Sequence, residues 1–168
     1  MLTADRIMEL LDLRPLPEEG GHYAETHRAG PLPPDALPAH YAGPRPRKTA
    51  IYYLLTTETF SAMHRLPGDE IFHFYLGDPV EQLQLFPDGT GRVVRIGTDL
   101  LAGERPQVHV PGGVWQGAHL VPGGRHGYAL LGTTMAPGFD VADYEGGRRD
   151  ELVAGYPTFR ELIETLTR

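Results

Sequence analysis

The sequence predicts an all-β fold with a short helix near each end of the chain. Runs rich in Ile, Leu, Val and Tyr alternate with turns, and the 168 residues include 21 Gly and 16 Pro, more than an ordinary globular chain carries. Many short strands joined by tight turns favour a sandwich or a barrel. The length fits one domain, residues 1–168, and is enough to bury a substantial core.

Both predicted helices follow from the spacing of apolar residues. In residues 4–13, apolar side chains recur at i, i+3 and i+4 with charged residues between them, which indicates an amphipathic helix that ends before Pro15. Near the other end, Thr158 and Glu161 have the spacing of a capping box, and the apolar residues around and after them predict a closing helix.

Between the helices the pattern predicts strands. The turn sequence at residues 87–91, Pro-Asp-Gly-Thr-Gly, predicts a hairpin between the two runs that flank it. Residues 29–46 hold six prolines and little apolar periodicity, so we expect an ordered surface loop or a lid there. The predicted strands cover residues 48–56, 81–86, 92–96, 108–110, 119–121 and 128–135.

Composition excludes several classes of function. A net charge of -7 without a local cluster of Lys and Arg argues against a nucleic-acid partner, because phosphate backbones would be repelled. The absence of cysteine excludes disulfides, a thiolate nucleophile and Cys-ligated metals. Neither a signal peptide nor an apolar run of membrane-spanning length is present, so we expect no membrane partner and a cytoplasmic location.

Two segments carry the strongest motifs. Residues 64–77 read His-Arg-Leu-Pro-Gly-Asp-Glu-Ile-Phe-His-Phe-Tyr-Leu-Gly, in which Gly77 follows Glu70 by seven positions. Residues 110–116 read Val-Pro-Gly-Gly-Val-Trp-Gln, a Pro-x-Gly turn with a polar residue three places on. Together the two segments resemble the paired motifs of cupins.

Further segments extend the resemblance over most of the chain. Residues 19–26, 50–55 and 136–140 match the order and spacing of the small cupins called DUF985 or the cupin-5 family, whose members have no settled activity. The resemblance implies a jelly-roll β-barrel, flanked by short helices, that encloses one pocket for a small molecule. Small cupins commonly pair, so it also implies a homodimer.

The metal site of cupins is altered in this sequence. Cupins pair a His-x-His and Glu motif with a final His, whereas here Met63 and Arg65 flank His64 and Gln116 replaces the last histidine. If a divalent metal such as Fe, Ni, Mn or Zn is present, its ligands would be His64, Glu70 and Gln116, and an amide oxygen is a weak donor. No cofactor is favoured.

The resemblance places Glu70 inside the barrel, near His64 and Gln116. Strand alternation puts every second residue from Glu70 to Leu76 on one face and His73 on the other, where it is structural, at a subunit interface or, through a bulge, in contact with ligand. Apolar neighbours would raise the pKa of Glu70, and His64 would be the complementary base. The candidate ligand contacts are Phe72, His73, Phe74, Trp115 and Gln116.

Three functions fit this pocket, and whether the protein is an enzyme stays open. The favoured one is isomerase- or epimerase-type proton transfer on a sugar-like or nucleotide-sugar-like metabolite, with His64 and Glu70 catalytic and Gln116 orienting the substrate. The first alternative is a metal-dependent, dioxygenase-like cupin, with iron, nickel or manganese held by His64, Glu70 and either His73 or Gln116. The second is a non-catalytic module that binds a small ligand. Trp115 could equally be core, the His64–Glu70 pair a structural hydrogen bond, and Tyr144 a residue of the pocket rim.

Overall fold

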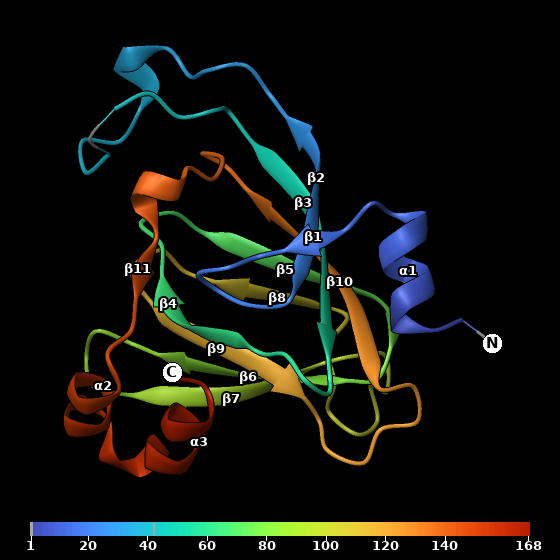
Figure 1. The fold of residues 1–168 in the computed structure, drawn as a ribbon. Helices are drawn as coiled ribbons and strands as arrows, with labels where there is room; N and C mark the ends of the chain where they lie inside the picture. The colour runs from blue at the N-terminus through green and yellow to red at the C-terminus, as the bar shows by residue number, and fades with distance from the viewer. Residues whose placement is uncertain (1, 42) are drawn as a thin grey trace.

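Two antiparallel sheets pack face to face and form a jelly roll (Figure 1). The structure is a computed structural model and describes residues 2–41 and 43–168. One sheet has the order β1-β2-β3-β10-β5-β8 and the other β11-β4-β9-β6-β7. The predicted all-β class is therefore confirmed. The strands are β1 (Arg14–Pro15), β2 (His22–Arg28), β3 (Thr49–Thr56), β4 (Ser61–Arg65), β5 (Glu70–Gly77), β6 (Val80–Leu85), β7 (Gly91–Ile96), β8 (Gln107–Val110), β9 (Trp115–Leu120), β10 (Tyr128–Met135) and β11 (Glu145–Gly146).

Short helices cover the outer faces of both sheets (Figure 1). Helix α1 (Ala4–Leu10) packs on the six-stranded sheet through Ile7, which belongs to the same buried cluster as Leu54 of β3. Helices α2 (Arg149–Gly155) and α3 (Arg160–Thr165) pack on the five-stranded sheet, against Leu83 and Leu85 of β6. The short 3-10 helices are η1 (Pro34–Ala36), η2 (Val141–Asp143) and η3 (Pro157–Phe159).

The ends of the helices differ in detail from the prediction. Helix α1 stops before residue 13 because the chain turns at Asp12, which has a positive φ of 50°. The predicted capping box was wrong: Thr158 lies within η3, and α3 begins at Arg160 without a side-chain capping bond. Helix α2 was not predicted, and its N-cap residue, Arg148, makes no side-chain capping bond that would have signalled a start.

The space between the sheets holds the main apolar core, and β5 contributes its inward face. Phe72 is buried in this core and Phe74 packs against it. A bulge at Tyr75 then breaks the alternation, because Phe74 pairs with Leu131 while Leu76 pairs with the adjacent Leu130. Leu76 consequently packs in the outer cluster beneath α1, so the expectation that it shares a side with Glu70 was wrong. The buried core residues are Tyr53, Leu55, Phe72, Val80, Ile96, Val108, Val110, Val114, Ala118, Leu120, Ala129 and Leu131.

The predicted hairpin is formed by β6 and β7, with Val80 opposite Ile96 and Leu85 opposite Gly91. Strand β6 is buried on both faces: Leu83 and Leu85 lie under the C-terminal helices, and Gln82 and Gln84 are also buried. Alternation therefore puts these two glutamines inside the barrel rather than toward solvent.

The described part of the proline-rich segment, residues 29–41 and 43–46, is held together at its base and bonded to η2. Pro31 and Pro46 form an isolated bridge within the segment, and Nε of the buried Arg45 donates to Asp143 Oδ2 at 2.7 Å. Ala42 lies outside the described residues. Across residues 2–41 and 43–168, none of the helices has the length and apolar character needed to cross a bilayer.

Candidate functional site

The structure brings His64, Glu70 and Gln116 together inside the barrel. His64 on β4 pairs with Gln116 on β9, and Glu70 at the start of β5 faces them from the other sheet. Gln116 Nε2 donates to Glu70 Oε2 at 2.8 Å, which joins the two sheets. The exposed fractions are 1% for His64, 7% for Glu70 and 2% for Gln116, so this is an interior cluster of polar groups.

One hydrogen bond fixes the orientation of the His64 ring. Its Nδ1 lies 2.8 Å from the carbonyl oxygen of Ala62, and because a carbonyl only accepts, Nδ1 carries a proton. In the neutral ring Nε2 is then the proton acceptor. Nε2 lies 3.8 Å from Glu19 Oε2, and the ring of Tyr144 stacks on the imidazole with centroids 5.2 Å apart.

Glu19 is a member of this cluster that the sequence argument did not single out. It lies on the turn between β1 and β2, and its Oε1 accepts from the Ser61 hydroxyl at 2.7 Å. The next residue, Gly20, has a φ of +103°, and a Cβ there would lie 2.3 Å from the carbonyl oxygen of Phe60. The signal in the sequence was the Gly20-Gly21 pair, because glycines let the backbone of this turn approach the segment at Phe60 closely.

Burial and charge set the proton affinities in the cluster. Burial raises the pKa of Glu70, and the nearby Glu19 carboxylate raises it further. His64, the Thr133 hydroxyl and Gln116 act in the opposite direction. Burial also raises the pKa of Tyr144 to about 12, so its phenol is neutral at physiological pH. The cluster thus combines an imidazole acceptor with a carboxyl group that holds its proton more tightly than an exposed glutamate.

The other predicted contacts divide between the inside and the outside of the barrel. Phe72 and Phe74 belong to the interior wall. Trp115 points out of the barrel, packs in the cluster beneath the C-terminal helices, and has the guanidinium of Arg65 4.6 Å above its ring. His73 lies on the outer face of its sheet, where Nε2 is 3.0 Å from Thr134 Oγ1. The structure does not bring Trp115 and His73 to the His64–Glu70 cluster.

The donors in this cluster do not fit a divalent metal. In the part of the chain that the structure describes, no group of three His, Cys, Asp or Glu side chains has a geometry that could hold one. Gln116 turns its amide nitrogen toward Glu70, and a nitrogen that carries two hydrogens is not a metal ligand. The predicted metal set of His64, Glu70 and Gln116 therefore offers one imidazole and one carboxylate.

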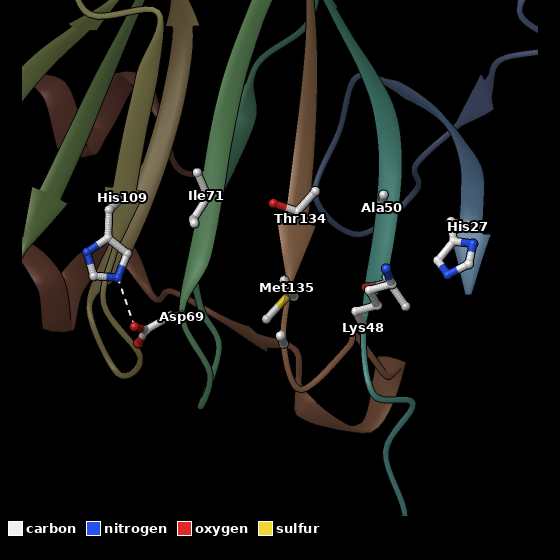
Figure 2. Close-up of a pocket in the computed structure, with 10 residues that line it drawn as sticks. His27, Lys48, Ala50, Asp69, Ile71, His109, Thr134 and Met135 are labelled. Atoms are coloured by element: carbon white, nitrogen blue, oxygen red, sulfur yellow. Dashed lines mark hydrogen bonds and ion pairs between the residues drawn. The ribbon is translucent and has the colours of Figure 1, made fainter. Parts of the chain in front are cut away.

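Clefts lie outside the barrel interior, and two of them adjoin the strands that carry the predicted residues. The first, of about 490 Å³, lies on the outer face of the six-stranded sheet, where His109 Nε2 is 2.9 Å from Asp69 Oδ2 and Lys48 and His27 stand at the far side (Figure 2). The second, of about 420 Å³, is lined by residues that include Arg65, Leu66 and Gly113 from the strand ends beside His64. Neither cleft is lined by any of the three clustered residues.

The second cleft adjoins the segment that covers His64. Asp143 and Glu145, which flank Tyr144, line this cleft. The Glu145 carboxylate accepts two hydrogen bonds from the Arg65 guanidinium, at 2.7 and 2.8 Å, and Asp143 forms an ion pair with Arg45. The two residues of β11 pair this segment with β4, and the Gly147 amide donates to the Met63 carbonyl oxygen at 2.7 Å.

Comparisons with known proteins agree with this architecture. The family model described as Cupin superfamily (DUF985) matches residues 5–146. An uncharacterised protein of Saccharomyces cerevisiae is 29% identical over 134 residues, which cover 75% of this chain and 66% of the yeast protein. This chain thus spans slightly less than two thirds of that relative.

Solved structures show the same fold. A hypothetical protein from Leishmania major has a TM-score of 0.88 at 29% identity, covering 99% of both chains. A protein from Shewanella oneidensis has a TM-score of 0.84 at 32% identity, covering 100% of this chain and 99% of the other. Oxalate decarboxylase from Bacillus subtilis has a TM-score of 0.53 at 13% identity, covering 92% of this chain and 37% of the enzyme, and shares the fold alone.

Proposed function

The chain belongs to the DUF985 family of the cupin superfamily, and we propose that its barrel interior transfers protons on a small hydroxylated carbonyl compound, as an isomerase or epimerase does. One observation carries the proposal. A fixed imidazole acceptor, His64, shares an interior site with Glu70, a carboxyl group whose pKa is raised by burial. A proton acceptor held beside a carboxyl group whose pKa is raised is what acid–base catalysis needs.

The roles follow from the contacts. His64 Nε2 would take a proton from a carbon next to the carbonyl, and protonated Glu70 would give one to the developing oxyanion or to the opposite face of that carbon. The imidazolium formed would lie 3.8 Å from Glu19, whose negative charge stabilises it. After this step His64 carries one proton more and Glu70 one proton fewer, and exchange of these protons with water resets the site; the reaction needs no oxidant or reductant.

The residues around the cluster combine aromatic and polar groups. Phe72 and Tyr53 belong to the interior core, Phe74 packs against it, and Gln116 and Glu70 supply polar groups. A pocket of this composition suits a sugar-like metabolite, whose ring has apolar faces and a polar edge. A ligand that stacks on the imidazole face now covered by Tyr144 would have to displace that ring.

The test is exchange of carbon-bound hydrogen with solvent. A panel of hydroxylated ketones and aldehydes is incubated with the protein in deuterium oxide and followed by NMR. We expect deuterium at the carbon next to the carbonyl in at least one compound, and a loss of roughly 100-fold or more in His64→Asn and in Glu70→Gln. His126→Asn, a change at an exposed histidine in a distant turn, is the matched control and should retain the activity.

Two outcomes would count against the proposal. Exchange that persists in the His64→Asn and Glu70→Gln double variant would place the chemistry elsewhere. Compounds that bind tightly in a calorimetric titration without any exchange would favour the non-catalytic binding module.

A further inference from the structure

A chain of side-chain amides runs from the barrel interior to the edge of the five-stranded sheet. Gln116 is followed by Gln82 and Gln84 on β6, and then by Arg92 on the edge strand β7. Gln82 and Gln84 are 1% and 0% exposed, whereas Arg92 is exposed. Gln84 and Arg92 are directly opposite in the β6–β7 register, so their side chains share one face.

Every hydrogen bond in this chain has the same direction. Arg92 Nε donates to Gln84 Oε1 at 2.9 Å, and Gln84 Nε2 donates to Gln82 Oε1 at 2.8 Å. Gln82 Nε2 donates to Gln116 Oε1 at 3.4 Å, the longest link, and Gln116 Nε2 donates to Glu70 Oε2 at 2.8 Å. Each amide therefore accepts on the side of Arg92 and donates on the side of Glu70.

Two groups that cannot change their role fix this direction at Gln84. The guanidinium of Arg92 has donors and no acceptor, so the atom of Gln84 that faces it must be the oxygen. The carbonyl oxygen of His109 has no proton to give, and it lies 3.2 Å from Gln84 Nε2. Both partners thus require the same orientation of the Gln84 amide. Gln82 and Gln116 must follow, because an amide oxygen can meet only a donor.

We propose that Arg92 is a positioning residue for the interior site, because it orients the amide of Gln116 as a hydrogen-bond donor to Glu70 through Gln84 and Gln82. A side chain on the surface, acting with the His109 carbonyl oxygen on Gln84, thereby helps to determine which atom of Gln116 faces the carboxyl group. Its role in catalysis rests on the proposed proton transfer, whereas the orientation itself does not.

The hydrogen-bonded chain from Arg92 through Gln84, Gln82 and Gln116 to Glu70, called the relay below, also determines what Gln116 can bind at the altered metal motif. Gln116 Oε1 is engaged by Gln82, so it is not free to coordinate an ion between His64 and Glu70. Turning the Gln116 amide round would bring its NH2 group against the NH2 group of Gln82, and reversing Gln82 and Gln84 as well would set donor against donor at Arg92. Gln116 is therefore a hydrogen-bond donor to Glu70 rather than a substitute for a histidine ligand.

Hydrogen–deuterium exchange of the side-chain amide protons, followed by NMR, tests the relay without a substrate. In Arg92→Met, which keeps an unbranched side chain as far as the position of Nε and loses its donors, protection of the Gln116 and Gln82 amide protons should fall by roughly tenfold, the factor that matches one buried hydrogen bond. Arg92→Lys, which restores a donor, should recover most of the protection. Arg95→Met on the same strand is the matched control and should behave as wild type, since Arg95 does not touch the relay.

Backbone amide exchange in β6 separates positioning from a structural role. Backbone protection of Leu83 and Leu85 should be unchanged in Arg92→Met. Unchanged protection of the Gln116 side chain in that variant would refute the proposal. So would an equal loss at backbone and side-chain amides, since Arg92 would then act by holding the hairpin together.

The relay and the proposed function fail separately. If protection changes as expected but no compound exchanges deuterium, the relay stands and the proton-transfer function is rejected. If exchange activity is found, Arg92→Met should lower kcat by roughly tenfold with little change in KM, because Arg92 acts on the orientation of the site and does not touch substrate.

Discussion

Replacing Gln116 by Leu should destabilise the protein more at high pH than at low pH. Gln116 is 2% exposed, donates to Glu70 at 2.8 Å and accepts from Gln82 at 3.4 Å. Leucine has a similar volume, so the main losses are these two hydrogen bonds. A hydrogen bond to a charged acceptor contributes about 1.5–3 kcal/mol, and a buried donor left without a partner costs about 1–3 kcal/mol.

The free energy of unfolding should therefore fall by about 3–4 kcal/mol when Glu70 is ionised. When Glu70 is protonated, the lost hydrogen bond is one between neutral groups and contributes about 0.5–1.5 kcal/mol, so the fall should be about 2 kcal/mol. The difference in free energy of unfolding between Gln116→Leu and the wild type should thus nearly double from low to high pH.

The sign of the pH dependence follows from the pKa of Glu70. Burial raises this pKa above the ordinary value of 4.5, so the folded state binds the proton more tightly than the unfolded chain. The stability of the wild type consequently falls as pH rises from 4.5 through the pKa of the folded state, and levels off above it. Gln116 opposes the shift, so its removal raises the pKa further and deepens the fall.

The assay is urea unfolding followed by the fluorescence of Trp115, the one tryptophan of the chain, at several values from about pH 4.5 to about pH 9. Gln107→Leu, a change at an exposed position of β8, is the control and should leave stability nearly unchanged. In a Glu70→Gln background, the pH dependence of the Gln116→Leu effect should disappear. A gap that stays constant across the pH range would refute the reasoning, because Gln116 would then not sense the charge of Glu70.

Two further substitutions test other parts of the structure. Gly77→Ala should cost about 3 kcal/mol of stability in thermal unfolding, since the φ is +108° and a Cβ would lie 2.2 Å from the Tyr128 carbonyl oxygen. Gly89→Ala is the control: its φ is +87° but the space around it is open, so it should cost only about 1 kcal/mol. Equal costs for the two variants would contradict the packing argument. Glu145→Gln removes an ion pair between β11 and β4 that contributes up to about 1 kcal/mol, so modification of His64 by diethylpyrocarbonate should become roughly twofold to fivefold faster. An unchanged rate, read by mass spectrometry at His64, would show that the Tyr144 segment does not control access.

Local patterns anticipated most of the fold. Strand β10 has the predicted bounds of residues 128–135, and the hairpin turned where Pro-Asp-Gly-Thr-Gly predicted. These succeed because a strand between two turn signals is determined by residues close in sequence. The bulge at Tyr75 has no such signal, since it depends on how two strands distant in the sequence align.

The interior site was predicted in part. The resemblance to cupins implied that His64, Glu70 and Gln116 lie together, and the structure places all three in one cluster. The sequence argument missed Glu19, which reaches His64 only because the β1–β2 turn packs against β4. Gln82 and Gln84 were missed for a different reason: alternating polar residues in a strand ordinarily face solvent, and only the second sheet makes that face an interior one.

The sequence by itself determined the β-rich class, the terminal helices, the turns and the residue types available for proton transfer, because all of these depend on local periodicity and composition. The tertiary structure alone decided which side of each strand is buried, which atoms of Gln116 and His64 face Glu70 and Glu19, and how burial raises the pKa of Glu70. Proton affinity and amide orientation are set by groups that the folded chain brings within a few ångströms of each other, and this distance cannot be inferred from their separation along the sequence.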